Sequence, residues 1–296
     1  MPTLLVDVRR AVIRVFNMKL YSLADSAQEA LETFSVFTGE KPDLVPLGIR
    51  AVDEAIGGMY PGTGVIIAAA TGIGKSSIAL HGALRAAEEG VPVGIVSIED
   101  GPDVIGVRLL SWKSGVPTLD IRRGTLDPDQ LQRLDKARVA LEAMEYPVMA
   151  YPVGRPIEDV EDVLRAMGEA GIRLVYIDYL QKIRGGNQDR RNEVAGNFTR
   201  MQRICYDRGM VPVIISQLSR GFDPDRPPSI HMLKESGDLE NEARLIILLW
   251  RDTKEPDKLQ LKVGKSTFGG ERVRAEYVRN KAGFLVEVKE EFGEEF

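Results

Sequence analysis

Hydrophobic residues along the chain gather in short, nearly continuous runs, and longer amphipathic stretches lie between these runs. The runs have the length and continuity of strands buried on both faces of a sheet, and they cover residues 64–70, 91–99, 172–180, 211–218 and 243–251. Apolar residues recur at helical spacing over residues 76–89, 157–170 and 192–207. Strands that alternate with helices predict an α/β fold in which a mostly parallel central sheet is flanked by helices.

The two ends of the chain depart from this alternation. Residues 258–288 alternate between polar and apolar positions by twos, which is typical of antiparallel strands added at one edge of the sheet. Residues 22–37 carry helical spacing instead, with Ser22 and Asp25 placed as a capping box. One face of this helix is apolar: Leu23, Ala27, Leu31 and Phe34. That face must be buried, either against the chain's own large domain or against a neighbouring subunit.

We therefore expect an N-terminal arm with a linker helix over residues 1–44, one large domain over 45–288 and an acidic tail over 289–296.

The composition argues against several classes of protein. Cys205 is the single cysteine, so no disulfide framework forms within the chain, and a cytoplasmic location fits. No run of about 18 apolar residues is present, as a membrane span requires. The net charge of −5 disfavours nonspecific coating of nucleic acid but permits a few basic loops.

The clearest chemical signal is a phosphate site. The first apolar run leads into a glycine-containing loop and then a helix, which is the P-loop pattern, although Ala69 stands where the pattern has its first glycine. Small residues let backbone N–H groups wrap phosphates, Lys75 can reach the β and γ phosphates, and Ser76 can hold Mg²⁺. The predicted nucleotide-binding residues are Ala69, Ala70, Thr71, Gly72, Ile73, Gly74, Lys75, Ser76, Ser77 and Asp178.

Three polar residues come at the ends of predicted strands: Glu99, Asp178 and Gln217. In α/β sheets, ligands bind beyond the carboxyl ends of the strands. Asp178 can therefore hold Mg²⁺ with Ser76, partly through water, while Glu99 can orient the attacking water. Gln217 can sense the γ phosphate. Each of the three could instead be a solvated side chain at a strand end.

Several segments outside the P-loop carry a family resemblance. They read VPLGIRAVDEAIGG, VSIED, IRRGTLDPDQLQRL, VYIDYLQKIR, VPVIISQLSR and LKESGDLENEARLIILLWRD. In this order, over about residues 45–284, they resemble the C-terminal motor domain of DnaB-type hexameric replicative helicases of superfamily 4. The resemblance implies a RecA-like P-loop domain in a ring of six, with ATP or another NTP and Mg²⁺ between subunits. Single-stranded DNA would lie in the central channel, with movement from 5′ to 3′.

The resemblance also implies roles for individual residues. Glu99 would be the catalytic base, Asp178 the Walker B acid and Gln217 the γ-phosphate sensor. Two loops would face the ring centre, one beginning near Lys182 and one following Gln217, although both could be ordinary solvated loops. The DNA-binding residues predicted in them are Arg184, Arg190, Arg191, Arg220, Lys234, Glu235 and Gly237. The family typically has arginine where Lys234 stands, and lysine keeps the charge.

Two departures from the family pattern affect the interpretation. The family's N-terminal primase-binding domain has no counterpart in this sequence, so we expect a separate primase or loader, or a shortened and phage-encoded relative. The family also carries a Lys-x-Arg pair that reaches the neighbouring subunit's γ phosphate. Lys265 matches the lysine, but Thr267 stands where the arginine finger would be. Arg272 or Arg251 could substitute for it.

Three function classes therefore remain open. The first is a ring helicase. The second is a RecA-like recombinase or annealing ATPase that forms filaments, and the third is a regulatory P-loop ATPase that does not move along DNA. The LKESGDLENEA segment and the position of the linker helix favour the helicase.

Overall fold

The computed structural model describes residues 22–33, 43–185, 190–219, 226–233 and 237–288, apart from the side chains of residues 33, 190, 191, 237 and 238. The chain divides into two units, Met1–Leu44 and Val45–Phe296. Helix α2 belongs to the first unit, and the sheet belongs to the second.

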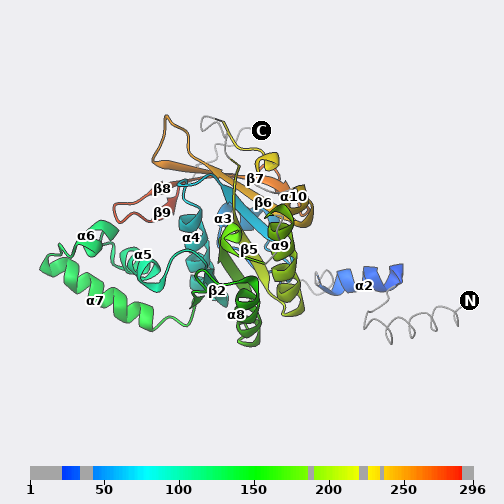
Figure 1. Cartoon of the computed structure of the whole chain (residues 1–296), viewed down its shortest axis with the longest axis horizontal. Coiled ribbons are helices and arrows are strands. Elements are labelled where there is room, and N and C mark those ends of the chain that lie inside the picture. The colour runs from blue at the N-terminus through cyan, green and yellow to red at the C-terminus, as the bar shows by residue number, and fades with distance from the viewer. Residues whose placement is uncertain (1–21, 34–42, 186–189, 220–225, 234–236, 289–296) are drawn as a thin grey trace, which may run out of the picture. The chain divides into compact units, whose positions relative to one another are not determined.

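A nine-stranded sheet runs through the described part of the second unit (Figure 1). Its strands are β1 (Val65–Ala69), β2 (Val93–Ser97), β3 (Val148–Ala150), β4 (Leu174–Asp178), β5 (Val211–Gln217), β6 (Leu245–Trp250), β7 (Lys258–Ser266), β8 (Arg274–Arg279) and β9 (Leu285–Glu287). Their order is β3-β2-β4-β5-β1-β6-β7-β8-β9. Pairing is parallel from β3 to β6 and antiparallel from β6 to β9. The predicted parallel sheet with an antiparallel C-terminal edge is confirmed.

Helices cover both faces of this sheet, with α4 on one face and α8 and α9 on the other. The helices of the second unit are α3 (Arg50–Ile56), α4 (Lys75–Glu88), α5 (Pro102–Ser114), α6 (Thr118–Arg123), α7 (Pro128–Glu142), α8 (Ile157–Glu169), α9 (Arg190–Asp207) and α10 (Gly237–Glu242), with the 3-10 turns η1 (Leu180–Lys182) and η2 (Ile230–Met232). Among the described residues, no helix is long and apolar enough to cross a membrane.

Alternate side chains of the central strands build the two halves of the core. Val65 and Ile67 of β1 pack on the same side as Leu84 of α4. Ile66, between them, packs on the opposite side with Phe198 of α9. Because helices cover both faces, both sets of side chains are buried, and the strand is apolar at every position.

Helices α5, α6 and α7 form a group beside the sheet (Figure 1), in a region to which the sequence analysis assigned no element. The start of α7 is a capping box: the Gln130 N–H donates to Asp127 Oδ1 at 2.8 Å, and the Asp127 N–H donates to Gln130 Oε1 at 3.0 Å. Pro128 follows the cap as the first helical residue. The sequence therefore held a helix signal here that was missed.

The first unit contains the helix α2 (Leu23–Thr33). The predicted capping box is confirmed, because the Ser22 N–H donates to Asp25 Oδ2 at 2.8 Å and the Asp25 N–H donates to Ser22 Oγ at 3.1 Å. Leu23 of the apolar stripe is 93% exposed. Phe34 and the expected helix end at residue 37 lie outside the described residues. What buries the stripe stays a prediction.

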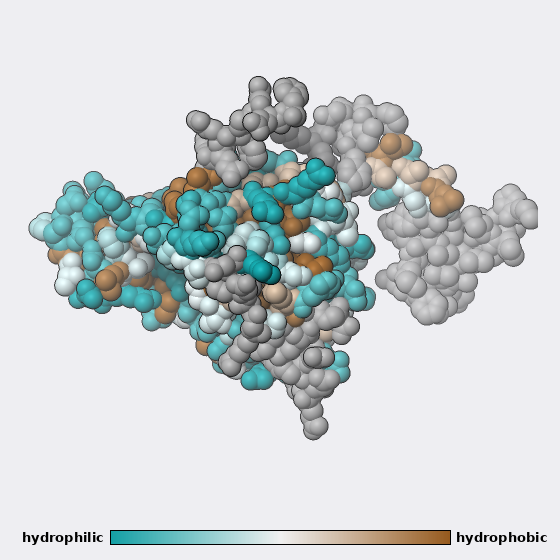
Figure 2. Space-filling view, turned by 90° about the horizontal axis from the view of Figure 1, so that it is seen from above, coloured by the Kyte–Doolittle hydropathy of each residue, from teal (hydrophilic) through white to brown (hydrophobic). Residues whose placement is uncertain are grey.

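The surface of the described residues is mainly hydrophilic on the face shown in Figure 2. Hydrophobic side chains appear there singly or in small groups between polar ones. Scattered apolar side chains are ordinary on protein surfaces, so this view gives no ground for a docking surface.

The segment that precedes α3 is held against β4 and α4. The Tyr176 hydroxyl of β4 donates to the Leu47 carbonyl oxygen at 2.6 Å, and the Leu47 N–H donates to Asp53 Oδ1 at 2.7 Å. Gly48 has φ +74°, and a Cβ there would lie 2.0 Å from the Gly82 carbonyl oxygen of α4. The close approach of the two backbones therefore requires glycine.

Replacing Tyr176 with Phe should destabilise the domain by about 1–3 kcal/mol, because the buried Leu47 carbonyl loses its donor. Chemical denaturation followed by circular dichroism measures the free energy of unfolding. Tyr206→Phe is the matched control, since that side chain is 68% exposed. Equal stability of both variants would contradict a structural role for the Tyr176 hydroxyl.

Candidate nucleotide site

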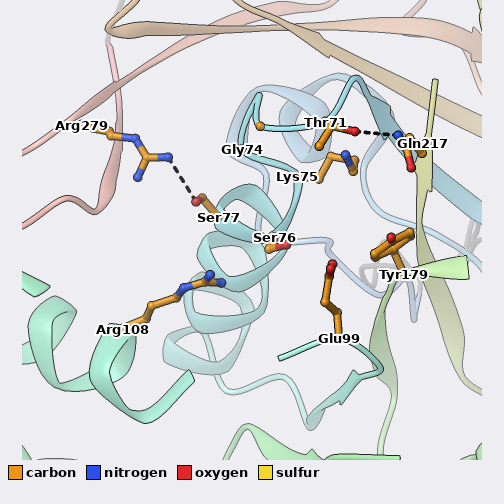
Figure 3. Close-up of a pocket in the computed structure, with 11 residues that line it drawn as sticks. Thr71, Gly74, Lys75, Ser76, Ser77, Glu99, Arg108, Tyr179, Gln217 and Arg279 are labelled. Carbon is orange, nitrogen blue, oxygen red and sulfur yellow. Dashed lines mark hydrogen bonds between the residues drawn. The ribbon is translucent and has the colours of Figure 1, made fainter. Parts of the chain in front are cut away.

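A cavity of about 270 Å³ lies at the carboxyl ends of the central strands, beside the first turn of α4 (Figure 3). Its lining residues are Thr71, Gly72, Gly74, Lys75, Ser76, Ser77, Glu99, Arg108, Tyr179, Gln217 and Arg279. The structure thus brings the predicted loop together with two of the three strand-end residues, from β2 and β5. Ala69, Ala70 and Ile73, also predicted to bind nucleotide, do not line the cavity. Ala69 is the buried last residue of β1.

Two glycines give the loop a backbone conformation that other residues rarely adopt. Gly72 has φ +81° and Gly74 has φ +124°, conformations that residues with a Cβ rarely adopt. Lys75 begins α4, and its Nζ donates to the Ala70 carbonyl oxygen at 3.1 Å. Burial lowers the pKa of the Lys75 ammonium, and the charges of Asp178 and Glu99 raise it in part. A phosphate placed in the loop would meet this ammonium and the N-terminus of α4 together.

Asp178 lies behind the loop, where it can hold a metal ion with Ser76. Burial raises the pKa of the Asp178 carboxyl, while a hydrogen bond from Ser76 lowers it. Its Oδ1 is buried and has no hydrogen-bond partner among the described residues. An oxygen ligand without a partner beside a hydroxyl fits Mg²⁺. The described residues contain no group of three or more His, Cys, Asp or Glu that could hold a metal by themselves.

Glu99 comes two residues after the end of β2 and projects into the cavity from the side opposite the phosphate loop (Figure 3). Its side chain is about half exposed, and its Oε1 lies 3.6 Å from Lys182 Nζ. A carboxylate that faces the end of a bound triphosphate across an open cavity can take a proton from water.

Gln217 joins the end of β5 to the phosphate loop. Its Nε2 donates to Thr71 Oγ1 at 2.6 Å. Its backbone N–H donates to Gln181 Oε1 at 3.1 Å, and Gln181 Nε2 donates to Ser216 Oγ at 2.9 Å. The side chain of Gln181 therefore fixes the end of β5 to η1, a link that the sequence analysis did not assign.

Three arginines surround the loop: Arg108 and Arg279, which the sequence analysis did not mark, and Arg251, which it named only as a possible substitute for the arginine finger. Arg108 of α5 pairs with Asp100 at 3.0 Å, and its Nη1 is buried without a partner among the described residues. Arg279, at the end of β8, donates to Ser77 Oγ at 3.5 Å (Figure 3). Arg251 donates through Nε to the Ile73 carbonyl oxygen at 2.9 Å, and burial followed by the charge of Arg279 lowers its pKa. Cations gathered in this way favour a polyanion.

A second cavity of about 240 Å³ adjoins the first and shares Ser77, Arg108 and Arg279 with it. Leu80 and Phe284 give it an apolar part. Small-molecule pockets have volumes of roughly 300–1,000 Å³, so each cavity alone is smaller than a typical ligand pocket.

Comparison with known proteins decides the family. The sequence profile of the DnaB-like helicase C terminal domain family matches residues 45–294. The chain belongs to this family. The replicative DNA helicase DnaB of Leifsonia xyli subsp. xyli is 32% identical over 214 residues, which cover 71% of this chain and 47% of that protein. The replicative DNA helicase DnaC of Bacillus subtilis is 27% identical over 261 residues, which cover 84% of this chain and 58% of that protein. The chain thus spans about half the length of these relatives.

Solved structures share the fold of this DnaB-like domain. A DnaB-like replicative helicase, described together with its interactions with primase, matches with a TM-score of 0.79 and 23% identity over 92% of this chain and 68% of that chain. A structure described as an ATPase domain matches with a TM-score of 0.80 and 23% identity over 92% of this chain and all of the other. The expected RecA-like α/β fold is confirmed.

The remaining predicted residues of the DnaB-like domain lie away from the cavity or outside the described residues. Lys265, on β7, donates to the carbonyl oxygens of Glu240 at 2.5 Å and Asn241 at 3.4 Å. Arg184 is exposed just after η1, and Gly237 begins α10. Outside the described residues or side chains fall Arg190, Arg191, Arg220, Lys234 and Glu235.

Replacing Lys75 with Ala should raise the dissociation constant for a nucleoside triphosphate about ten- to a hundredfold, the scale of a missing charge-assisted hydrogen bond. Turnover should fall with it. Fluorescent-nucleotide titration and phosphate release provide the two measurements. Lys136→Ala, on the exposed side of α7, is the matched control. Unchanged binding by the Lys75 variant would show that the phosphates lie elsewhere.

Proposed function

We propose that the chain is the motor domain of a replicative DNA helicase, which moves along single-stranded DNA as a ring driven by NTP hydrolysis between subunits. The hydrogen bond from Gln217 to Thr71 carries the proposal. It ties the phosphate loop to the end of β5, and the chain leaves that end towards the second predicted DNA loop. Phosphate release and DNA movement can thereby be coupled through one side chain.

The nucleotide would lie along the two adjoining cavities with its γ phosphate between Lys75 and Gln217. Ser76 and Asp178 would hold Mg²⁺, which when bound supplies positive charge to the β and γ phosphates. Arg108 and Arg279 would contact the polyanion from α5 and β8, which explains why guanidinium groups line a cavity with few acidic partners.

Hydrolysis would follow from positioning and charge stabilisation. Water attacks the γ phosphorus, the bond to the bridging oxygen breaks, and a nucleoside diphosphate and inorganic phosphate remain. Glu99 accepts the proton that the water loses. Lys75 stabilises the charge that develops on the phosphate oxygens.

The neighbouring subunit would add a cation to each site. Arg251 is held by its own phosphate loop and donates to the carbonyl oxygens of Ile73 and Pro256, so it belongs to the site of its own chain. Arg272 is exposed. We assign the contact across the interface to Arg272, because Thr267 stands in place of the family's arginine finger. Lys265 would join it after leaving the carbonyl oxygens of Glu240 and Asn241.

DNA and protein partners complete the proposal. Arg184 and the basic residues of the two predicted loops would follow the phosphate backbone in the ring centre. The apolar stripe predicted for the linker helix would dock on a neighbouring subunit of a homohexamer. A separate primase or helicase loader would act with the ring in the cytoplasm.

Electron microscopy and a strand-separation assay test the whole proposal. The chain is mixed with NTP, Mg²⁺ and a forked DNA carrying single-stranded tails. Closed rings with NTP-dependent strand separation support the helicase. Filaments on DNA would indicate a recombinase, and hydrolysis with neither assembly would indicate a regulatory ATPase.

Glu99→Gln should preserve nucleotide affinity but lower turnover about a hundredfold, because the amide keeps the shape and loses the proton acceptor. Phosphate release at saturating nucleotide measures this effect. Glu271→Gln, an exposed substitution between β7 and β8, serves as the control. Near-normal turnover in Glu99→Gln, with loss in Asp178→Asn, would move the base to β4.

Arg184→Glu should weaken single-stranded DNA binding nearly independently of base sequence and leave nucleotide affinity unchanged. The slope of log affinity against log salt should flatten by about 0.7 for each DNA phosphate that the protein no longer neutralises. Fluorescence anisotropy with labelled oligonucleotides across a salt series measures this slope. Arg203→Glu on α9 makes the same charge change on a side chain that is also exposed. Equal effects of both variants would indicate only long-range charge.

A further inference from the structure

The carboxylate of Glu99 faces a cation that does not belong to the phosphate loop. Lys182 Nζ lies 3.6 Å from Glu99 Oε1, and the two side chains are 49% and 48% exposed. The same ammonium lies 5.9 Å from the ring centre of Tyr179, which also lines the cavity. Lys182 is thus an additional charged group beside the proposed base.

The backbone that carries Lys182 is fixed, although the side chain is exposed. Leu180, at the start of η1, and Ile183, directly after it, are fully buried. Gln181, directly before it, is hydrogen-bonded to Ser216 and to the backbone of Gln217. Lys182 can therefore exchange partners without unfolding the turn or moving the end of β5.

The ion pair between Lys182 and Glu99 makes Glu99 a less effective general base. A carboxylate oxygen that is drawn towards an ammonium is directed away from the attacking water and is a poorer acceptor for its proton. Exposed ion pairs contribute only about 0.2–1 kcal/mol, so another anion can replace Glu99 as the partner of Lys182. A weak pair is therefore suited to repeated opening.

If the domain moves along DNA, a phosphate of the DNA backbone can compete with Glu99 for Lys182. Arg184, the proposed DNA contact, stands two residues after Lys182 and is also exposed. Its backbone is held by a bridge to Pro156, so both cations extend from one fixed stretch of chain. A backbone phosphate is as good a partner for an ammonium as a carboxylate is.

We infer that Lys182 is a positioning residue that restrains Glu99 until a phosphate of single-stranded DNA takes over its ammonium group. Without DNA, Lys182 holds the carboxylate and hydrolysis is slow. With DNA, Lys182 pairs with the strand and Glu99 turns to the attacking water. The inference rests on the proposed function, because it assumes that Glu99 is the base and that DNA passes η1.

The test compares the full chain with its Lys182→Leu, Lys182→Arg and Lys136→Leu variants. Phosphate release is measured without DNA and with a saturating single-stranded oligonucleotide. Lys182→Leu should raise the rate without DNA about two- to fivefold, the rate equivalent of an exposed ion pair. The stimulation by DNA should shrink by the same factor. Lys182→Arg and the Lys136→Leu control should keep wild-type rates, and nucleotide affinity should be unchanged in all three.

A double variant separates release of Glu99 from a general effect on the site. Adding Lys182→Leu to Glu99→Gln should give no acceleration, because no carboxylate remains to be released. Acceleration in that background, or a DNA-free rate of Lys182→Leu at or below that of the wild type, would overturn the inference. Absence of any DNA stimulation in the wild type would instead count against the helicase proposal itself.

Discussion

The site depends on the parallel pairing of β1, β2, β4 and β5. Parallel neighbours end at the same edge of a sheet, so each strand delivers its last residue to one place. The register pairs Ala69 with Gln217 and Ser97 with Asp178. The glycine-containing loop after β1, Asp178 and Gln217 are therefore brought together by backbone hydrogen bonds.

This constraint explains how far the sequence could predict the site. Continuous apolar strands and the polar residue that ends each one are visible along the chain, so Glu99, Asp178 and Gln217 could be grouped in advance. Arg108 and Arg279 could not, because only tertiary packing brings α5 and β8 beside α4. Helix α5 also has few buried residues, so its apolar positions gave no clear face to recognise. The capping residues Asp127, Pro128 and Gln130 are a sequence signal from which the start of α7 could be predicted.

Buried charged groups without partners make the site less stable, and a bound ligand would supply those partners. Buried guanidinium nitrogens of Arg108 and Arg251 and one buried oxygen of Asp178 lack partners among the described residues. Buried polar groups without partners are unfavourable, and the cluster of cations repels itself. A triphosphate with its metal ion would supply acceptors to the arginines and a cation to the carboxylate. Binding energy would thus relieve strain that the sheet holds in place.

The lead-in segment also determines where mechanical load enters the domain. Leu47 is bonded to Tyr176 of β4, and Gly48 lies against the backbone of Gly82 in α4. Helix α4 begins at Lys75, in the phosphate loop. Tension on the chain ahead of Val45 would first meet the backbone hydrogen bonds between Val45 and Met59, and then the contacts of Leu47 and Gly48 with the strand and the helix that carry Asp178 and Lys75.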